Sequence, residues 1–206
     1  MKSYSSIIFD LGGVILNIDF QKSIDSFKQK IPGFDDHDYN GKPNQNEIFS
    51  RYEVGATDTD TFYQEFLEHY QTNLSFESFC ESWNAMLLDM PRARVELLDS
   101  LRKRGTRVFL LSNINALHAE RTEEIYENLG MSGRFRQHFE RGYYSFEMGL
   151  RKPDAQIFLQ VLAENALQAS ETLFIDDGAQ HVASADKLGL QTIHLFNRES
   201  IDKLSL

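Results

Sequence analysis

The sequence is short of cysteine, of long apolar runs and of positive charge, and each shortage excludes a class of protein. Cys80 is the only cysteine among the 206 residues, so a disulfide framework and a cluster of thiolate metal ligands are both excluded. No apolar run approaches the length that spans a membrane. The formal net charge of -10 repels phosphate backbones and anionic lipids, so we expect neither a nucleic-acid partner nor a membrane partner.

The first residues also lack an export signal. Residues 1–6 lead directly into the first apolar run, without a charged stretch followed by an apolar one, and we therefore expect a cytoplasmic protein. Hydrophobic residues make up 41% of the chain and charged residues 25%, which is ordinary for a globular protein. A chain of 206 residues is long enough for one core, or for a core that carries a smaller inserted domain.

The clearest chemical signal is the stretch 7–14, in which three apolar residues lead to Asp10 and then to Gly12 and Gly13. This pattern predicts a buried strand over residues 7–10 that breaks sharply at its carboxyl end. Ligands of parallel sheets bind just outside the carboxyl ends of strands, so Asp10 is well placed for chemistry. Taken alone, such an aspartate is more simply explained by turn formation.

Between residues 21 and 89 the apolar residues recur at helical spacing, which predicts a bundle of roughly four helices. The stretches that separate the helices contain proline, glycine or asparagine and lie at residues 32–33, 41–44, 55 and 73–75. We expect Asn44, Thr57 and Ser75 to cap helix N-termini. The preceding residues 15–20 alternate in polarity and predict a short extended segment or hairpin arm.

After residue 90, predicted strands alternate with predicted helices. Apolar runs predict strands at residues 107–111, 141–146, 172–175 and 191–195. Amphipathic spacing predicts helices at residues 91–104, 116–129, 153–167 and 180–189. Alternation of this kind gives right-handed crossovers and a parallel sheet with helices on both faces. We therefore predict an α/β fold with a Rossmann-like core at 1–16 and 90–206 and an inserted helical bundle at 17–89.

Polar side chains follow the predicted strands or lie in the loop before a helix. They are Asp10, Ser112, Asn113, Lys152, Asp176 and Asp177. Each has a plainer interpretation as a helix cap or a solvated side chain. Because the carboxyl ends of parallel strands meet at one edge, we expect these side chains to lie together. Three acids, a hydroxyl group and a lysine at one place suit a divalent cation and an anionic substrate.

These residue types fit phosphoryl transfer. A carboxylate at Asp10 can accept a phosphoryl group as an acyl phosphate, which divides a difficult hydrolysis into two displacements. Asp176 and Asp177 would hold Mg²⁺, which neutralises phosphate charge. Ser112 would donate a hydrogen bond to a phosphoryl oxygen, and Lys152 would supply the remaining positive charge.

Four stretches also match a family pattern, in the order that the family has them. They are Phe-Asp-Leu-Gly-Gly-Val at 9–14, Leu-Leu-Ser-Asn at 110–113, Arg-Lys-Pro-Asp at 151–154 and Phe-Ile-Asp-Asp at 174–177. The chain thus resembles the haloacid dehalogenase superfamily, and its helical block resembles that family's C1-type cap. Residues 18–20, the Glu53-Val54-Gly55 stretch and Trp83 are similar to small bacterial phosphatases of sugar phosphates such as α-D-glucose 1-phosphate.

The resemblance implies Mg²⁺-dependent hydrolysis of a small-molecule phosphate ester through an aspartyl-phosphate, by a monomer or homodimer. The catalytic residues it implies are Asp10 as nucleophile, Ser112 and Lys152. The substrate contacts it implies are Ser112, Asn113, Lys152 and Glu53, the last on the cap. The metal ligands it implies are Asp10, the backbone carbonyl of Gly12, Asp176 and Asp177, and which of the two adjacent acids coordinates the ion directly stays open.

The sequence departs from the family pattern at two positions. Gly12 stands where the family commonly has an aspartate that protonates the leaving group. Loss of a positioned acid typically costs about 10²–10⁴-fold in rate, unless the leaving group is weakly basic or another acid replaces it. His181 stands where related phosphatases often have asparagine, and it either bonds to Lys152 or Asp177 or simply lies on the next helix.

Two alternatives to a phosphatase stay open at this point. A metal-independent 2-haloacid dehalogenase needs no proton for its halide, which makes Gly12 less awkward, but it leaves Asp176 and Asp177 as anions without a counter-charge. A non-catalytic phosphate-binding protein would have lost turnover together with its acid. The nucleophile and the charged groups around it favour the phosphatase.

Overall fold

The strands of one parallel sheet set the architecture. The computed structural model describes residues 4–35, 47–195, 200–204 and 206. Within this part of the chain, five strands form a sheet with the order β3-β2-β1-β4-β5, and all neighbouring pairs are parallel. Their bounds are β1 Ser6–Phe9, β2 Arg107–Ser112, β3 Arg141–Tyr144, β4 Thr172–Asp176 and β5 Gln191–His194.

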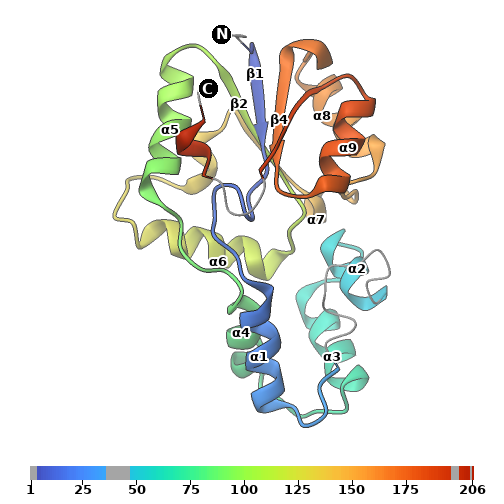
Figure 1. Cartoon of the computed structure of the whole chain (residues 1–206). Helices are drawn as coiled ribbons and strands as arrows, with labels where there is room; N and C mark the ends of the chain where they lie inside the picture. The colour runs from blue at the N-terminus through green and yellow to red at the C-terminus, as the bar shows by residue number, and fades with distance from the viewer. Residues whose placement is uncertain (1–3, 36–46, 196–199, 205) are drawn as a thin grey trace.

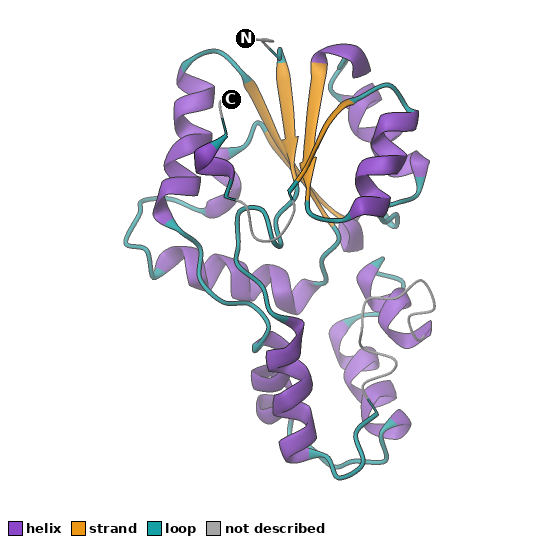
Figure 2. Cartoon of the chain, in the orientation of Figure 1, coloured by secondary structure: helices purple, strands orange, loops and turns teal. Residues whose placement is uncertain are grey.

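Side chains of each strand point alternately to the two faces of the sheet, and helices cover both faces (Figures 1 and 2). Ile7 and Phe9 are buried on one face, whereas Ile8 is buried on the other. The first face is covered by α5 (Arg92–Lys103) and α6 (Ala116–Glu127), and the second by α8 (Ala155–Glu164) and α9 (Ala179–Lys187). The predicted α/β class is therefore confirmed.

The helices between β1 and α5 form a bundle with a core of its own. They are α1 (Phe20–Lys30), α2 (Glu47–Glu53), α3 (Thr59–His69) and α4 (Phe76–Asn84). Phe27, Phe62 and Phe66 are fully buried in this helical bundle, and the ring centroids of Phe27 and Phe66 are 5.0 Å apart. Leu117 of α6 packs into the same cluster. The bundle thus lies against the sheet domain, beyond the carboxyl ends of the strands (Figure 1).

Two connecting segments join the bundle to the sheet side by side. Ile18 and Leu87 form an antiparallel bridge, and the backbone N–H of Asn17 donates to the oxygen of Asp89 at 2.9 Å. Each segment therefore satisfies backbone groups of the other. The extended conformation predicted for residues 15–20 is confirmed at residues 16–19, whereas Ile15 lies in a turn and Phe20 already begins α1. The domain boundaries at 16/17 and 89/90 stay predictions.

The helix caps differ from the predicted ones at one place. Asp58, rather than Thr57, caps α3, because its carboxylate accepts a hydrogen bond from the backbone N–H of Thr61 at 2.8 Å. Ser75 caps α4 as predicted. Asn44, the other expected cap, lies outside the described residues.

Two predicted elements are shorter in the structure. The strand predicted at 141–146 ends at Tyr144, and residues Ser145–Met148 form a helical turn, α7. The helix predicted at 153–167 begins at Ala155, because the Asp154 carboxylate caps it by accepting from Gln156 N at 2.9 Å. Short 3₁₀ helices complete the described chain, with bounds η1 Phe135–His138, η2 Ala169–Glu171 and η3 Ile201–Lys203.

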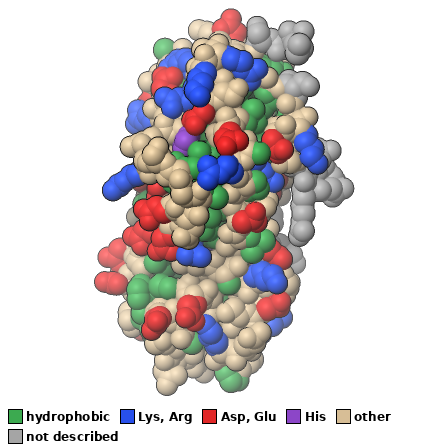
Figure 3. Space-filling model, turned by 90° about the vertical axis from the view of Figure 1, so that its left-hand side faces the viewer, with side chains coloured by type: hydrophobic (Ala, Val, Ile, Leu, Met, Phe, Trp, Pro, Cys, Tyr) green, Lys and Arg blue, Asp and Glu red, His purple; other side chains and the backbone are tan. Residues whose placement is uncertain are grey.

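The surface agrees with the charge balance of the sequence. On the face drawn in Figure 3, acidic and basic side chains are mixed over its height rather than gathered in one basic patch. Across the described residues, every helix is too short or too polar to cross a lipid bilayer.

We predict that truncating the inner face of α8 destabilises the protein far more than truncating its outer face. Ile157 is fully buried against the sheet, whereas Leu159, two residues along, is 42% exposed. Ile157→Ala should lower the free energy of unfolding by about 2–5 kcal/mol. Leu159→Ala should change it by about 0.5 kcal/mol or less. Urea denaturation measures both, and equal losses would contradict this packing.

Candidate active site

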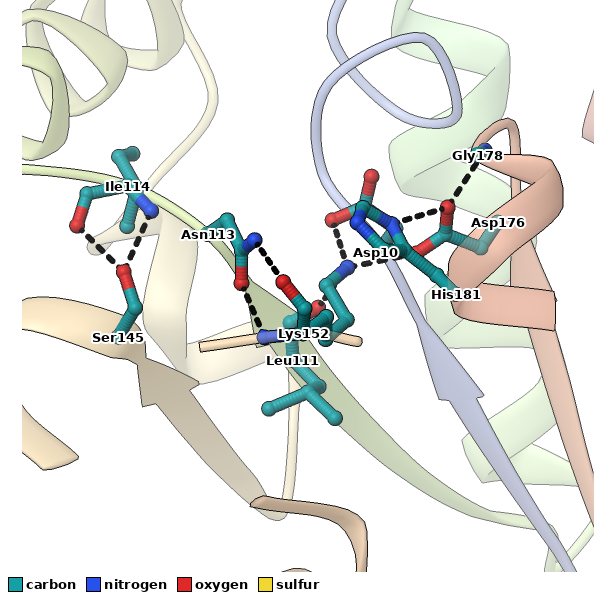
Figure 4. A network of polar contacts seen from close by, with 9 residues as sticks. All are labelled: Asp10, Leu111, Asn113, Ile114, Ser145, Lys152, Asp176, Gly178 and His181. Atoms are coloured by element: carbon teal, nitrogen blue, oxygen red, sulfur yellow. Dashed lines mark hydrogen bonds and ion pairs between the residues drawn. The ribbon is translucent and has the colours of Figure 1, made fainter. Parts of the chain in front are cut away.

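Lys152 ties three strand ends together. Its side chain is fully buried, and its Nζ donates to Asp10 Oδ1 at 2.7 Å, to Asp176 Oδ2 at 2.6 Å and to the backbone oxygen of Leu111 at 2.9 Å. An ammonium group has three donors, so these bonds use all of them. Figure 4 shows the side chain reaching between the ends of β1, β2 and β4. The predicted convergence of these residues is therefore present in the structure.

The charges in this group shift one another's pKa values. Burial alone would lower the pKa of Lys152, but the carboxylates of Asp10 and Asp176 outweigh it, and the pKa of Lys152 is raised. Burial raises the pKa of Asp10 to about 7, against the effect of Lys152. Burial also opposes ionisation of Asp176, yet Lys152 and a hydrogen bond from His181 hold the pKa of Asp176 well below its usual range. Lys152 thus opposes the effect of burial on both carboxylates and favours the ionised form that a nucleophile needs.

Asn113 fixes the backbone of Lys152. Its Oδ1 accepts from the N–H of Lys152 at 2.8 Å, and its Nδ2 donates to the Lys152 carbonyl oxygen at 2.8 Å (Figure 4). Both amide atoms are therefore used to position the lysine. Ser112, one residue earlier, is the last residue of β2 and only 3% exposed, and it lies in the pocket wall beside Lys152.

Three acids form the group that suits a metal ion. Asp10, Asp176 and Asp177 each offer a carboxylate oxygen, and these oxygens lie within 4.8 Å of one another. Burial, followed by the charge of Asp176, raises the pKa of Asp177, so a bound cation would relieve this repulsion. Gly13 has a φ of +73°, and a Cβ there would lie 2.1 Å from Asp177 Oδ2. These hard oxygen donors and the glycine cradle beside them fit Mg²⁺.

His181 contacts a partner that the sequence did not indicate. Its Nδ1 is 2.9 Å from Asp176 Oδ1, which also accepts from the backbone N–H of Gly178 at 2.7 Å (Figure 4). The histidine does lie on the next helix, α9, as one interpretation held, but its hydrogen bond goes to Asp176 and not to Lys152 or Asp177. It thereby helps to orient that carboxylate.

A pocket of about 540 Å³ opens between the sheet edge and the helical bundle. Its sheet side includes Asp10, Gly12, Ser112, Asn113, Lys152 and Asp177. Its opposite side includes Phe20, Phe49, Glu53, Trp83, Met86 and Leu87. Asp176 is fully buried behind this surface, where it contacts Lys152 and His181. The structure thus brings the sequence-predicted site residues to one pocket and its immediate support.

Asn115, His118 and Arg151 also line the pocket, and no role was predicted for them. Arg151 Nη1 lies 3.0 Å from Glu53 Oε2, so the residue beside Lys152 forms an ion pair with the bundle. The sequence feature that could have indicated a role for Arg151 is its position in the 151–154 motif. Asn115 and His118 lie at the start of a predicted helix, and nothing in the sequence indicated that they line a pocket.

Asn115 and His118 attach one wall of the pocket to Trp83 of the bundle. His118 Nε2 is 3.1 Å from the Trp83 carbonyl oxygen, Asn115 Nδ2 is 3.1 Å from His118 Nδ1, and Trp83 Nε1 donates to Asn115 Oδ1 at 3.3 Å. Burial lowers the pKa of His118 to about 4, so its ring is neutral at pH 7. A neutral ring in this setting donates from Nε2 to the carbonyl oxygen and accepts at Nδ1.

The helical bundle covers a pocket at the carboxyl edge of the parallel sheet, and this pocket holds a buried lysine beside a cluster of acids. Such an arrangement is typical of α/β hydrolases that carry a helical cap and bind an anionic substrate with a cation. The model of the haloacid dehalogenase-like hydrolases matches residues 4–189. The chain therefore belongs to this family, and the resemblance seen in the sequence is confirmed.

Individual relatives agree with this assignment. The chain is 28% identical over 189 residues to a D-ribitol-5-phosphate phosphatase of Bacteroides thetaiotaomicron, which covers 91% of this chain and 89% of the relative. A crystal structure of a haloacid dehalogenase (HAD) family enzyme from that species has a TM-score of 0.83 and 30% identity, with 94% of each chain covered. Its complex with magnesium and inorganic phosphate has a TM-score of 0.82 and 29% identity, and covers 93% of this chain and 94% of that one.

We predict that Gly13→Ala weakens Mg²⁺ binding by about 10–100-fold, because the new Cβ displaces the Asp177 carboxylate. Gly33→Ala is the matched control, since Gly33 has nearly the same φ, +75°, and a Cβ there would meet nothing within 4 Å. Both variants should share a cost of about 1–2 kcal/mol in stability from the left-handed backbone. Titration calorimetry with Mg²⁺ measures the affinity, and equal affinities of the two variants would contradict the role of Gly13.

Proposed function

We propose that the protein is a Mg²⁺-dependent phosphatase that hydrolyses a small phosphorylated metabolite through an aspartyl-phosphate at Asp10. The observation that carries this proposal is the Asp10 carboxylate, bound to the buried Lys152 ammonium at 2.7 Å beside a cluster of acids. A cation-binding edge with a carboxylate beside a buried ammonium suits phosphoryl transfer. The similarity to a ribitol-phosphate phosphatase supports the same chemistry.

In this proposal each sheet residue has a separate task. Asp10 attacks the phosphorus atom, and Lys152 offsets the repulsion between that carboxylate and the phosphate. Ser112 donates a hydrogen bond to a phosphoryl oxygen. Asn113 holds the Lys152 backbone in place, and Asn113 itself also lines the substrate pocket. When bound by Asp10, Asp176, Asp177 and the Gly12 carbonyl, Mg²⁺ supplies positive charge toward the phosphate.

We further propose that the substrate is a sugar phosphate or a sugar-alcohol phosphate. The bundle side of the pocket combines the Glu53 carboxylate, paired with Arg151, with the aromatic rings of Phe49 and Trp83. Charged groups can form hydrogen bonds with hydroxyl groups, and the faces of aromatic rings can pack against the carbon skeleton of a polyol. The helices of residues 17–89 would then act as the cap that excludes water during transfer.

The clustered acids disfavour the metal-independent dehalogenase. Asp10, Asp176 and Asp177 share one buried ammonium, and an anionic haloacid would add a further negative charge there. The intact pair of Asp10 and Lys152 likewise disfavours a protein that binds phosphate without turnover.

We predict that Asp10→Asn lowers the rate of phosphate release from sugar phosphates by at least about 10³-fold, because an amide is no nucleophile for phosphorus. Asp25→Asn, at an exposed position on α1, should leave the rate unchanged. A colorimetric phosphate assay with purified variants measures both. Retention of activity by the Asp10 variant would overturn the proposed nucleophile.

Removal of divalent cations should stop the same reaction. With EDTA, phosphate release is expected to fall to background, and Mg²⁺ in excess should restore it, because the acid cluster then regains its counter-charge. The assay is run over sugar phosphates, nucleotides and phosphorylated cofactors. Full activity in EDTA would contradict metal dependence, and chloride release from a 2-haloacid under those conditions would favour the dehalogenase.

A further inference from the structure

Phosphate esters of alcohols need a proton as well as a nucleophile. When the bond from phosphorus to the ester oxygen breaks, that oxygen takes the bonding electron pair and leaves as a strongly basic alkoxide unless it is protonated. A positioned acid typically contributes about 10²–10⁴-fold to such a step. The pocket should therefore contain a proton donor on the side where the leaving group lies, opposite Asp10.

Most ionisable groups that line the pocket are committed to other contacts. Lys152 uses all three donors on Asp10, Asp176 and Leu111. His118 is neutral, and its Nε2 bonds to the Trp83 carbonyl oxygen. The remaining ionisable groups of the pocket wall are Glu53, Arg151, Asp177 and His181.

Of these four, only one is a carboxyl group outside the acid cluster. Asp177 belongs to the cluster itself, and His181 bonds to a member of it. The guanidinium of Arg151 stays protonated in proteins and is no acid. This leaves Glu53.

Glu53 is held on the bundle side of the pocket. It is the last residue of α2, and its side chain is 16% exposed. Its carbonyl oxygen accepts from Ser145 Oγ at 2.7 Å, and Ser145 Oγ also accepts from the backbone N–H of Ile114 at 2.9 Å. Figure 4 shows Ser145 beside Ile114, on the loop that follows β2. The end of α2 is thus fastened to the same strand edge that carries the phosphate site.

The surroundings of Glu53 suit a group that holds a proton and then releases it. Burial raises the pKa of Glu53, while Arg151, His181 and Lys152 face it and act in the opposite direction. A phosphate dianion in the pocket adds negative charge and favours the protonated form. After the proton has left, Arg151 Nη1, 3.0 Å from Oε2, stabilises the carboxylate.

We propose that Glu53 is the general acid that protonates the leaving oxygen, an inference that rests on the proposed phosphatase function. Asp10 forms a bond to phosphorus, the ester P–O bond breaks, and the leaving oxygen takes its electron pair and the Glu53 proton to become an alcohol. In the second step water attacks phosphorus and gives a proton to the Glu53 carboxylate. Asp10 leaves as a carboxylate, and the products are the alcohol and inorganic phosphate.

The test compares two substrates of nearly equal shape, phenyl phosphate and 4-nitrophenyl phosphate, in Mg²⁺. Phenolate is much the more basic leaving group and needs the proton more. Glu53→Gln keeps the size of the side chain and one oxygen that can accept from Arg151, but it cannot act as an acid. It should lower kcat/KM, which reports the steps up to cleavage of the ester bond, by about 10²-fold for phenyl phosphate and by about threefold or less for 4-nitrophenyl phosphate. Glu47→Gln, at the exposed start of α2, is the control and should change neither.

The other outcomes separate the two proposals. Equal losses in kcat/KM on both substrates would show a role that does not depend on the leaving group, and would overturn the acid. If the wild-type protein releases phosphate from neither ester and from none of the sugar phosphates, the phosphatase function itself fails.

A second measurement on the wild-type protein guards against a variant that folds poorly. The ratio of kcat/KM for phenyl phosphate to kcat/KM for 4-nitrophenyl phosphate should fall as the pH rises through the pKa of Glu53. A ratio that stays constant with pH would likewise overturn the proposal.

Discussion

The buried ammonium of Lys152 is the interaction on which the site depends. A lysine without partners in this place would lose its proton or force the chain to open, because burial of an unpaired charge is costly. Its three acceptors come from the ends of β1, β2 and β4, so the charge is satisfied only when these strands are in register. Loss of one partner of such a buried pair typically costs about 3–5 kcal/mol. Folding of the sheet and assembly of the site are therefore coupled.

The fold was largely predictable from local patterns. The alternation of short apolar runs with amphipathic stretches after residue 90 contains enough information for a parallel sheet, and the helical spacing between residues 21 and 89 indicates the bundle. The errors lie at element ends, where single side chains decide. The Asp58 carboxylate caps α3 in place of Thr57, and the Asp154 carboxylate starts α8 two residues after Pro153. Such choices depend on side-chain geometry that a pattern does not contain.

The site was predictable where its residues directly follow strands or lie in a family motif, as Lys152 does. Asp10 and the acids at the end of β4 could be found because strand ends share one edge of a sheet. The contact of His181 with Asp176, and the clamp of Asn113 on the Lys152 backbone, depend on how loops fold over that edge. The pairing of Arg151 with Glu53 joins segments almost a hundred residues apart, and it required the bundle to be placed. Sequence spacing alone does not specify contacts of this kind.

The central claim is that Asp10 carries the phosphoryl group between the two halves of the reaction. The most direct measurement is rapid acid quenching during turnover of 4-nitrophenyl phosphate in Mg²⁺, followed by peptide mass spectrometry. We expect a phosphoryl group on Asp10 in the first turnover, and no phosphoryl group there when EDTA is present. A phosphoryl group on another residue, or turnover at full rate without any phosphorylated peptide, would contradict it.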